Sequence, residues 1–384
     1  MRLLFTALGA HGHLFPLMPL AVAAREAGHH VVFATAVDFR ATLEKAGLEP
    51  ATAGLTIGEA FASQFPDFTP GLARRELPPE ELAATVGNVF GRVMPERFAA
   101  DLRALFEQHR PDLVVYEVGN PGGAFAAKTA GIPAVGHGFG RVSTGGLMTA
   151  IDRSMREYAD ELGITEEGPA WGTPFVDICP PSVQSPEFLA RTHRLPLRPV
   201  GWSDSGDLPS GVVDRDRSRP LVYLTLGTSP MSQAGVLTSA ITGLSGLDAD
   251  VLVATGPSLD PAVLGEVPPN VRLEAWVAQS ALLPHVDLVV HHGGSGTTLG
   301  AFSAGAPQLV LPQGADQFAN AEAVLASGTG ARLLDDELTA ESVHETAARL
   351  LTDPTVADAV RGVAAEVAAM PSPAEVAGQL PQYA

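Results

Sequence analysis

The chain has 384 residues, of which 46% are hydrophobic and 17% are charged, and its net charge at pH 7 is −19. This length is too great for one ordinary core and fits two domains of roughly 150 to 200 residues each. The acidic balance argues against binding to nucleic acid or to an anionic membrane, because both require a local surplus of lysine and arginine. A single cysteine, Cys179, excludes an internal disulfide and a zinc site built from cysteines, so we expect a cytoplasmic protein.

Two apolar runs near the start, residues 2–8 and 29–35, are expected strands, and the segment between them is an expected helix that Gly28 ends. A strand, a helix and a second strand in this order form a βαβ unit of a parallel sheet. The two prolines of residues 15–21 lack a backbone N–H and fit a helix only in its first turn. They place the start of this helix near His13.

The same alternation returns at residues 110–119, an expected strand, which is followed by an expected helix over 122–131 and a strand over 132–138. Before it, residues 55–95 mix charges, prolines and phenylalanines, and we expect loops and irregular helix there. The phenylalanines of this segment either line an apolar pocket or seal the domain's own core. They are Phe61, Phe65, Phe68 and Phe90.

A second α/β series follows a polar, turn-rich segment, residues 201–219, which we expect to link two domains. Apolar runs predict the strands of a second parallel sheet, at residues 220–228, 249–256, 270–277, 286–294 and 307–313. The chain is therefore expected to be an α/β protein with two similar halves. In open sheets of this kind, ligands bind at the carboxyl ends of the strands, which we expect to face a crevice between the halves.

The strongest single motif lies at residues 289–305, "VVHHGGSGTTLGAFSAG", where an apolar strand runs into glycines and then into a helix that opens at Ser295. The N–H groups and the positive dipole end of such a helix bind phosphate. No lysine follows the glycines, and their spacing differs from the dinucleotide fingerprint, which argues against ATP and dinucleotides. Taken alone, these glycines are also consistent with a plain turn between strand and helix.

Longer segments resemble family 1 glycosyltransferases. Residues 276–321 are similar to the nucleotide-sugar signature of that family, residues 12–21 to its amino-terminal motif, and residues 370–380 to the closing helix of bacterial antibiotic glycosyltransferases. The resemblance, which includes the enzymes that glycosylate enediynes and macrolides, covers essentially the whole chain, weakly over 55–95 and 140–215. It implies the GT-B fold, in which two Rossmann-like domains with parallel sheets face a central cleft.

The resemblance also implies domain boundaries. An acceptor-binding domain would cover residues 1–200 and be completed by the carboxyl-terminal helix, at about 370–384. A nucleotide-sugar-binding domain would cover residues 220–369, after the linker at 201–219. The acceptor-binding side chains of the first domain would be Phe61, Phe65 and Phe90.

By the same resemblance, residues of the second domain would bind the donor. Trp276 would lie against the nucleobase and Gln279 beside the nucleoside sugar, whereas Asp316 and Gln317 would hold hydroxyls of the transferred sugar. Trp276 could instead be a core aromatic residue, and Asp316 could cap the helix that follows it. The donor-binding set comprises Thr228, Trp276, Val277, Gln279, His292, Gly294, Ser295, Gly296, Thr297, Asp316 and Gln317.

One position departs from the family pattern. Plant members that use uridine diphosphate (UDP) sugars carry a glutamate for the ribose hydroxyls three residues after the phosphate-binding serine or threonine, and this position is Gly300 here. Glycine cannot make those bonds, and a deoxyribose has less need of them, so we expect a thymidine diphosphate (TDP) donor. His292 would donate to its diphosphate, while His291 points the other way from the strand and is expected to be structural.

The two histidines near the amino terminus receive different roles. Sugar transfer needs a base for the acceptor hydroxyl, and histidine, whose ordinary pKa is about 6.5, suits that task. The residue that matches the family's base is His13, and Glu117 matches the carboxylate that orients it, although many members carry aspartate there. A solvated glutamate at the end of a strand is the alternative for Glu117. His11 is expected to be a loop residue.

The sequence therefore predicts an inverting transferase that moves a deoxysugar from TDP to a hydrophobic polyketide, macrolide or enediyne aglycone in antibiotic biosynthesis. Because no pair of carboxylates precedes the glycine loop, we expect no metal and no other cofactor, and the helix dipole with His292 and Thr297 would stabilise the diphosphate. A nucleotide-sugar epimerase of the same fold and a noncatalytic auxiliary protein that binds sugar nucleotides are the alternatives. A homodimer is compatible with the sequence.

Overall fold

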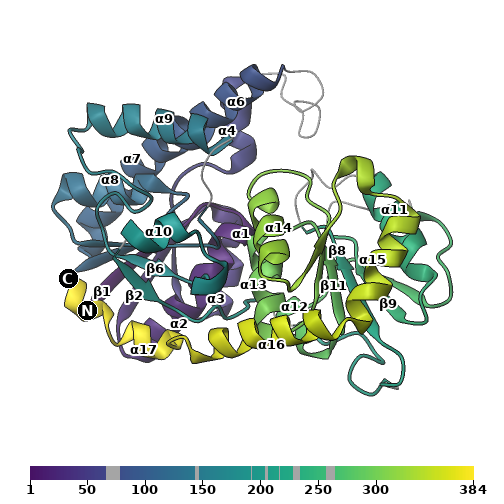
Figure 1. The fold of residues 1–384 in the computed structure, drawn as a ribbon. Helices are drawn as coiled ribbons and strands as arrows, with labels where there is room; N and C mark the ends of the chain where they lie inside the picture. The colour runs from purple at the N-terminus through teal and green to yellow at the C-terminus, as the bar shows by residue number, and fades with distance from the viewer. Residues whose placement is uncertain are drawn as a thin grey trace. The chain divides into compact units, whose positions relative to one another are not determined.

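The computed structural model describes residues 1–65, 78–142, 147–191, 193–203, 206–215, 217–227, 234–256 and 264–384. The chain divides into two compact units. The first comprises Met1–Cys179, Ser185–Arg198 and Pro371–Ala384, and the second comprises Pro180–Gln184 and Pro199–Met370. Each unit contains one parallel sheet with helices packed around it (Figure 1). The expected α/β class with two parallel sheets is confirmed.

The first unit is built on seven parallel strands in the order β3-β2-β1-β4-β5-β6-β7. The strand order reverses between β1 and β4, which pair with each other, and open α/β sheets bind ligands at such a switch point. The strands are β1 (Arg2–Thr6), β2 (His30–Thr35), β3 (Glu49–Thr52), β4 (Leu113–Glu117), β5 (Ala134–His137), β6 (Phe175–Asp177) and β7 (Arg194–Pro196).

The helical region after β1 begins at His11 rather than near His13 and consists of three short segments. Pro16 and Pro19 lie within the first two positions of the second and third segments, where a missing N–H breaks no hydrogen bond. Residues 55–95, expected as loops and irregular helix, hold two regular helices and a π-helical turn in their described part. The helices of this unit are α1 (His11–Leu14), η1 (Phe15–Leu17), α2 (Met18–Glu26), η2 (Val37–Phe39), α3 (Arg40–Lys45), α4 (Ile57–Gln64), α6 (Pro79–Asn88), η3 (Val89–Val93), α7 (Met94–His109), α8 (Pro121–Ala130), α9 (Leu147–Glu161), α10 (Pro186–Arg191), α17 (Pro373–Ala377) and η8 (Leu380–Tyr383).

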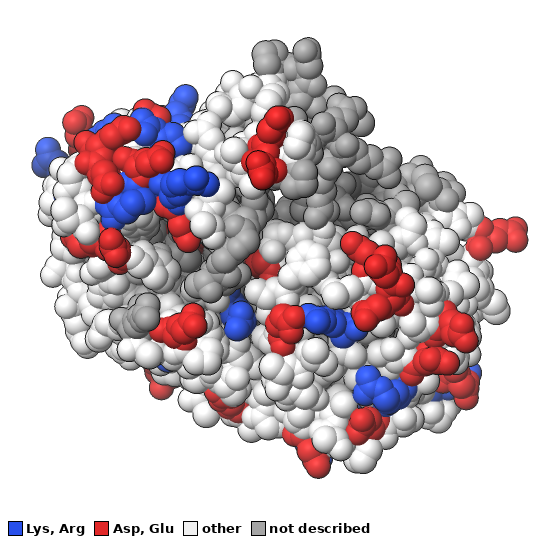
Figure 2. All heavy atoms as spheres, turned by 45° about the horizontal axis from the view of Figure 1, so that its top comes forward, with Lys and Arg blue, Asp and Glu red and all other residues white. Residues whose placement is uncertain are grey.

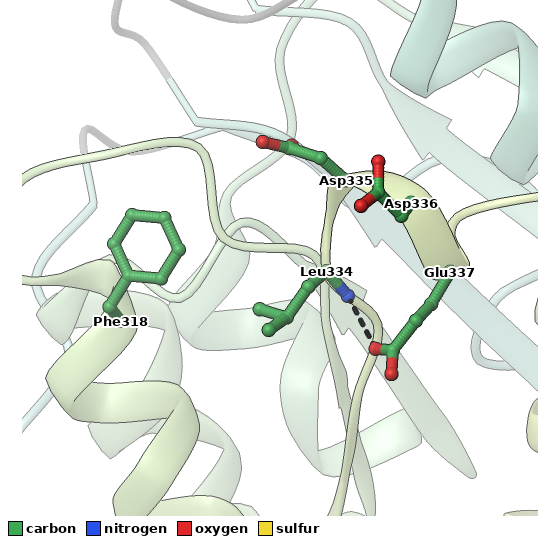
Figure 3. Close-up of a pocket in the computed structure, with 5 residues that line it drawn as sticks. All are labelled: Phe318, Leu334, Asp335, Asp336 and Glu337. Atoms are coloured by element: carbon green, nitrogen blue, oxygen red, sulfur yellow. Dashed lines mark hydrogen bonds between the residues drawn. The ribbon is translucent and has the colours of Figure 1, made fainter.

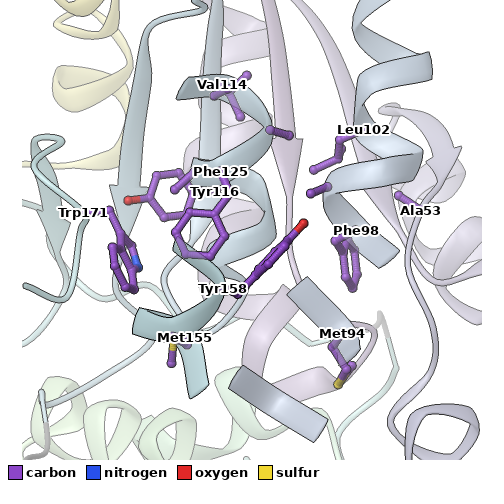
Figure 4. Packing of buried hydrophobic residues seen from close by; sticks show 14 of the residues in the cluster. Ala53, Met94, Phe98, Leu102, Val114, Tyr116, Phe125, Met155, Tyr158 and Trp171 are labelled. Atoms are coloured by element: carbon purple, nitrogen blue, oxygen red, sulfur yellow. The ribbon is translucent and has the colours of Figure 1, made fainter. Parts of the chain in front are cut away.

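Apolar side chains of β4 and of the helices around it form a large core in the first unit (Figure 4). Tyr116 and Phe125 are fully buried there. The Tyr116 hydroxyl donates a hydrogen bond to the backbone oxygen of Ala170 at 2.8 Å, which satisfies its polar end. Because β4 is buried along its whole length, its last residue, Glu117, is also held inside the unit.

The second unit is built on six parallel strands in the order β10-β9-β8-β11-β12-β13, with the switch point between β8 and β11. The strands are β8 (Leu221–Thr225), β9 (Asp250–Ala254), β10 (Val271–Glu274), β11 (Leu288–His291), β12 (Gln308–Val310) and β13 (Gly330–Arg332). The helices are η4 (Pro181–Val183), α11 (Ala234–Ser245), α12 (Gln279–Leu282), η6 (Leu283–His285), α13 (Ser295–Ala304), α14 (Gln317–Ala326), η7 (Asp335–Glu337), α15 (Ala340–Thr352) and α16 (Pro354–Ala369).

Residues 201–219, which we expected to be a linker, cluster with the second unit. Val212 is buried in an apolar core of this unit, and the hydroxyl oxygens of Ser203 and Ser280 lie 2.7 Å apart in a hydrogen bond. The turn-rich composition therefore belongs to loops that pack on the second unit. At the carboxyl end of the chain, α17 packs against α2 within the first unit, and a capping box forms its start.

Acidic and basic side chains are interspersed on the surface. On the face drawn in Figure 2, basic side chains lie beside acidic ones. Arg92 and Glu161 form an ion pair at 2.7 Å in the first unit. Within the described ranges, no helix is long and apolar enough to cross a membrane.

Candidate active site

A histidine and a buried carboxylate lie together at the switch point of the first sheet. His13 lies in α1, which follows β1, and Glu117 is the last residue of β4. His13 Nδ1 is 3.1 Å from Glu117 Oε2, and the side chains of the two residues are 24% and 0% exposed, respectively. The structure thus brings together the two residues that the resemblance pairs, and it excludes the solvated alternative for Glu117.

Two further contacts surround this pair. Oε1 of Glu117 accepts a hydrogen bond from the backbone N–H of Gly119. The ring of Phe139 lies 4.8 Å from the His13 ring, centroid to centroid, with a tilt of 47°. Phe139 follows β5, and the sequence carried no signal for this contact because it depends on β5 pairing with β4. Since Nδ1 of His13 faces Glu117, Nε2 is the ring nitrogen that can meet a substrate.

His11 opens helix α1, so it is not the loop residue that we expected. Its ring packs edge-on against Phe15 and Phe39, at centroid distances of 4.9 and 5.1 Å. These contacts give His11 a packing role.

His291 organises the glycine loop that follows β11. The residue is fully buried, its Nδ1 accepts a hydrogen bond from the backbone N–H of Gly293 at 3.1 Å, and its Nε2 lies 2.9 Å from Gln308 Oε1. Burial lowers the pKa of His291 to about 3, so the ring is neutral. Because Nδ1 is an acceptor, the single ring proton is on Nε2 and is donated to Gln308. This arrangement agrees with the structural role expected for His291.

The ring of His292 lies close to the backbone of two glycines. A Cβ atom at Gly227 would come within 2.6 Å of this ring, and one at Gly294 would come within 2.5 Å. Gly227 also has a φ of 80°, which other residues adopt only with strain. Burial lowers the pKa of His292 to about 4 and outweighs Asp316 and a backbone hydrogen bond of Thr225, which both raise it. The neutral ring has one N–H, which serves the backbone of Thr225, so His292 can donate to a ligand only by giving up that bond.

Helix α13 begins at Ser295, where we expected it, with Gly294 as its N-cap residue. Its first turn contains no acidic side chain, so nothing in that turn neutralises the positive end of the helix dipole. The Thr297 hydroxyl donates to Gln279 Oε1 at 3.1 Å and so joins α13 to α12. Thr228 lies outside the described residues.

The predicted nucleoside-binding positions lie near the end of β10 and along α13. Trp276 is 43% exposed, which excludes the core alternative for this residue, whereas Val277 beside it is buried. A Cβ atom at Gly300 would come within 2.6 Å of Leu283 Cδ1, so a larger side chain there would displace Leu283. Gly296, in the first turn of α13, is exposed, and a Cβ atom there would meet nothing within 4 Å.

The residues predicted to hold the transferred sugar lie at the start of α14. Oδ2 of Asp316 accepts a hydrogen bond from the Ser295 hydroxyl at 2.7 Å. Asp316 makes no side-chain capping bond to α14, so the capping alternative is wrong. Oε1 of Gln317 accepts from the backbone N–H groups of Gln313 and Gly314, at 2.7 and 3.0 Å. This leaves the amide nitrogen of Gln317 as the group that can meet a sugar.

Asn320 joins these residues and was missed by the sequence analysis. It is 3% exposed, and its Nδ2 lies 3.1 Å from both Asp316 Oδ2 and Ser295 Oγ. Its spacing of four residues from Asp316 on one helix was the signal that could have found it.

The predicted acceptor-binding phenylalanines are partly buried. Phe61 and Phe90 pack against the large core of the first unit, and their rings contact each other at 6.0 Å. Phe65 is half-buried where α4 ends. Phe68 lies outside the described residues. The core alternative therefore holds for Phe61 and Phe90, and the expected acceptor contact stays a prediction.

An open pocket of about 360 Å³ in the second unit is lined by Phe318, Leu334, Asp335, Asp336 and Glu337 (Figure 3). None of the predicted donor-binding residues lines it. Its carboxylates would repel a diphosphate. The loops after β11 and β12 are therefore better placed for the donor than this pocket.

Two domain models of one protein family match the chain. Residues 22–194 match the N-terminal domain, and residues 238–382 the C-terminal domain, of erythromycin biosynthesis protein CIII-like proteins. Elloramycin glycosyltransferase ElmGT of Streptomyces olivaceus is 37% identical over 341 residues, which cover 86% of this chain and 85% of the relative.

Solved glycosyltransferase structures share the fold. The glycosyltransferase SsfS6 of Streptomyces sp. SF2575, complexed with thymidine diphosphate, is 29% identical with a TM-score of 0.79, and the match covers 100% of this chain and 99% of that one. The spinosyn rhamnosyltransferase SpnG, complexed with spinosyn aglycone, is 27% identical with a TM-score of 0.79, over 99% of this chain and 100% of that one. The chain therefore belongs to the erythromycin biosynthesis protein CIII-like family of natural-product glycosyltransferases and has the GT-B fold.

Proposed function

We propose that the protein transfers a deoxysugar from a TDP-sugar to a hydrophobic natural-product aglycone, with inversion at the anomeric carbon. The observation that carries this proposal is the contact between His13 and the buried Glu117, which supplies an oriented base. The glycine loop and the start of α13 supply a site for the diphosphate. ElmGT, named for elloramycin, and SpnG, solved with spinosyn aglycone, support a natural-product acceptor.

In the proposed reaction, Nε2 of His13 accepts the proton of the acceptor hydroxyl as the hydroxyl oxygen bonds to the anomeric carbon. The bond from that carbon to the diphosphate oxygen breaks on the opposite side, which inverts the configuration, and TDP leaves with the electron pair. The carboxylate of Glu117 stabilises the resulting imidazolium. The N–H groups at the start of α13 and the neutral His292 ring donate to the charge that develops on the diphosphate.

Gly300 supports TDP as the nucleotide. A ribose 2′-hydroxyl would find no acceptor side chain at this position, and a glutamate there would have to displace Leu283. A deoxyribose loses nothing, and SsfS6 was solved with TDP. We expect TDP to bind about 10-fold more tightly than UDP, the effect of about one hydrogen bond. Calorimetric titrations that show UDP binding more tightly than TDP would rule out this donor.

We also propose that the diphosphate leaves without the help of a metal ion, because α13 and His292 supply donors for its charge. In the described part of the chain, no three His, Cys, Asp or Glu side chains form a group that could hold a metal ion. Treatment with EDTA is expected to leave the rate of transfer unchanged. A rate that falls with EDTA and recovers with magnesium would show that the leaving group needs a metal.

Product analysis tests the reaction as a whole. The protein is incubated with a panel of TDP-sugars and polyketide or macrolide aglycones, and the products are analysed by mass spectrometry and NMR. We expect a glycosylated aglycone with the anomeric configuration opposite to that of the donor. Free or epimerised sugar that forms without an aglycone would indicate an epimerase. Binding of TDP-sugar without turnover across the panel would indicate an auxiliary protein.

A further inference from the structure

A buried amide joins the starts of two helices in the second unit. Asn320 lies in the second turn of α14 and is 3% exposed. Its Nδ2 lies 2.8 Å from the backbone oxygen of Gly293, 3.1 Å from Ser295 Oγ and 3.1 Å from Asp316 Oδ2. One group thus contacts the glycine loop, the first residue of α13 and the residue before α14.

The hydroxyl of Ser295 is directed by this arrangement. It donates to Asp316 Oδ2 at 2.7 Å, and its oxygen accepts from Asn320. A hydroxyl has one hydrogen, so it cannot donate to a diphosphate while this bond exists. The side chain of Ser295 therefore acts on Asp316, and only the backbone N–H of Ser295 is left for the diphosphate. The predicted donor-binding role of Ser295 is thereby restricted to its backbone N–H.

The carboxylate of Asp316 is oriented as a result. Oδ2 accepts from the Ser295 hydroxyl, and it shares one N–H of Asn320 with Ser295 Oγ, because the other N–H serves the backbone oxygen of Gly293. Oδ1 is then the oxygen that can accept a bond from a hydroxyl of the transferred sugar. Charge-assisted bonds of this kind are the strong ones, so the orientation of the carboxylate controls how much the sugar adds to donor binding.

We infer that Asn320 is a positioning residue that, together with the Ser295 hydroxyl, sets the carboxylate of Asp316 for the transferred sugar. This role rests on the proposed function, because it presupposes that a nucleotide sugar binds at the starts of α13 and α14. Asn320 does not touch the sugar. It determines how much more tightly the protein binds a TDP-sugar than TDP alone.

Calorimetry separates this role from a merely structural one. We would measure the Kd of TDP, TDP-glucose and TDP-rhamnose for the wild type and for Asn320→Ala, Asn320→Leu and Ser295→Ala, using whichever TDP-sugar the wild type binds more tightly. Asn320→Leu keeps approximately the size of the side chain, removes the donor and adds no charge, so it serves if Asn320→Ala does not fold. Asn270→Ala is the matched control, because Asn270 donates to the backbone oxygens of Ser245 and Ala249 in the same unit.

The expected result is a loss that is specific to the sugar. Both Asn320 variants and Ser295→Ala should weaken TDP-sugar binding about 10-fold and TDP binding less than about 3-fold, since a hydrogen bond to a charged group is at stake. The double variant Asn320→Ala/Ser295→Ala should bind the TDP-sugar as tightly as the single variant with the higher Kd, because both residues act through Asp316. Asn270→Ala should change neither Kd.

Equal weakening of TDP and TDP-sugar in the Asn320 variants would overturn the inference, because Asn320 would then only hold the glycine loop. A loss of TDP binding in Ser295→Ala as large as its loss of TDP-sugar binding would also overturn it, since the hydroxyl would then serve the diphosphate. Failure of the wild type to bind any of the three ligands contradicts the proposed donor instead, so the two failures are distinguishable.

Discussion

Glu117 is a fully buried acidic residue at the end of β4. Its carboxylate is fully buried, one oxygen faces Nδ1 of His13, and the other accepts from the backbone of Gly119. Burying a carboxyl group without partners is costly, and the hydrogen bond from Gly119 together with the approach of His13 offsets part of that cost. The family resemblance singles out Glu117 as the partner of His13, but it does not predict that the side chain is buried. Whether the end of a strand is buried depends on the helices that pack over it.

Replacement of Glu117 tests that role. Glu117→Gln keeps the size of the side chain and removes the charge that stabilises the imidazolium. We expect kcat to fall by about 10²- to 10⁴-fold with little change in the KM for the TDP-sugar. Steady-state rates at saturating donor and acceptor measure this change. Glu44→Gln, which alters an exposed ion pair with Arg40, should keep the wild-type kcat.

The proposed donor site rests on the loops after β8 and β11. Gly227 lets the chain turn at a φ of 80° and lets the His292 ring lie where a Cβ atom would be 2.6 Å away. In Gly227→Ala we expect TDP to bind about 10-fold more weakly and stability to fall by about 1–2 kcal/mol, because both the backbone and the ring must shift. Gly211 has a φ of 79° and nothing within 4 Å of a Cβ atom, so Gly211→Ala provides the matched control.

Calorimetry and urea denaturation of the two glycine variants make the comparison. Gly211→Ala should lose stability through its backbone alone and bind TDP as the wild type does. If both variants bind TDP like the wild type, the His292 ring has no role in the diphosphate site.

Element by element, the central strands were predictable, whereas of the edge strands only β10 was. β4 and β8 are buried on both faces, so each reads as a continuous apolar run. β3 and β7 are four and three residues long and contain proline. They lie at the edges of the first sheet, where partial burial leaves no continuous apolar run in the sequence. The regular helices within 55–95 were missed because prolines and phenylalanines obscured their period.

At the scale of the whole molecule, three neutral histidines, of which His137 and His291 are fully buried and His292 is partly exposed, make stability depend on pH. Burial lowers the pKa of His137 and of His292 to about 4 and that of His291 to about 3. The unfolded chain protonates these residues below about 6.5, whereas the folded chain does not, so stability falls as the pH decreases from there toward 4. Each residue contributes up to about 1.4 kcal/mol per pH unit in that window.

Urea denaturation at pH 7.5, 6.5 and 5.5 measures this dependence. We expect the midpoint to change little between the first two values and to fall at the third. His137→Gln should reduce the fall, because one proton fewer is taken up on unfolding. A midpoint that stays constant down to pH 5.5 is incompatible with three histidines that remain neutral in the folded chain.

The division into units was also only partly predictable from composition. Residues 201–219 are rich in turn formers, as is typical of linkers. They nevertheless belong to the second unit, because Val212 is buried in one of its apolar cores. A single buried apolar residue in a polar segment is a weak signal, and only tertiary packing shows which unit it belongs to.

The central claim is that His13 removes the acceptor proton during sugar transfer. The most direct measurement is the rate of transfer by His13→Ala at saturating TDP-sugar and aglycone, together with its Kd for TDP. We predict a rate loss of about 10²- to 10⁴-fold with the Kd for TDP unchanged, because the histidine acts in the transition state and lies in the first unit. Transfer by His13→Ala at the wild-type rate would contradict the account.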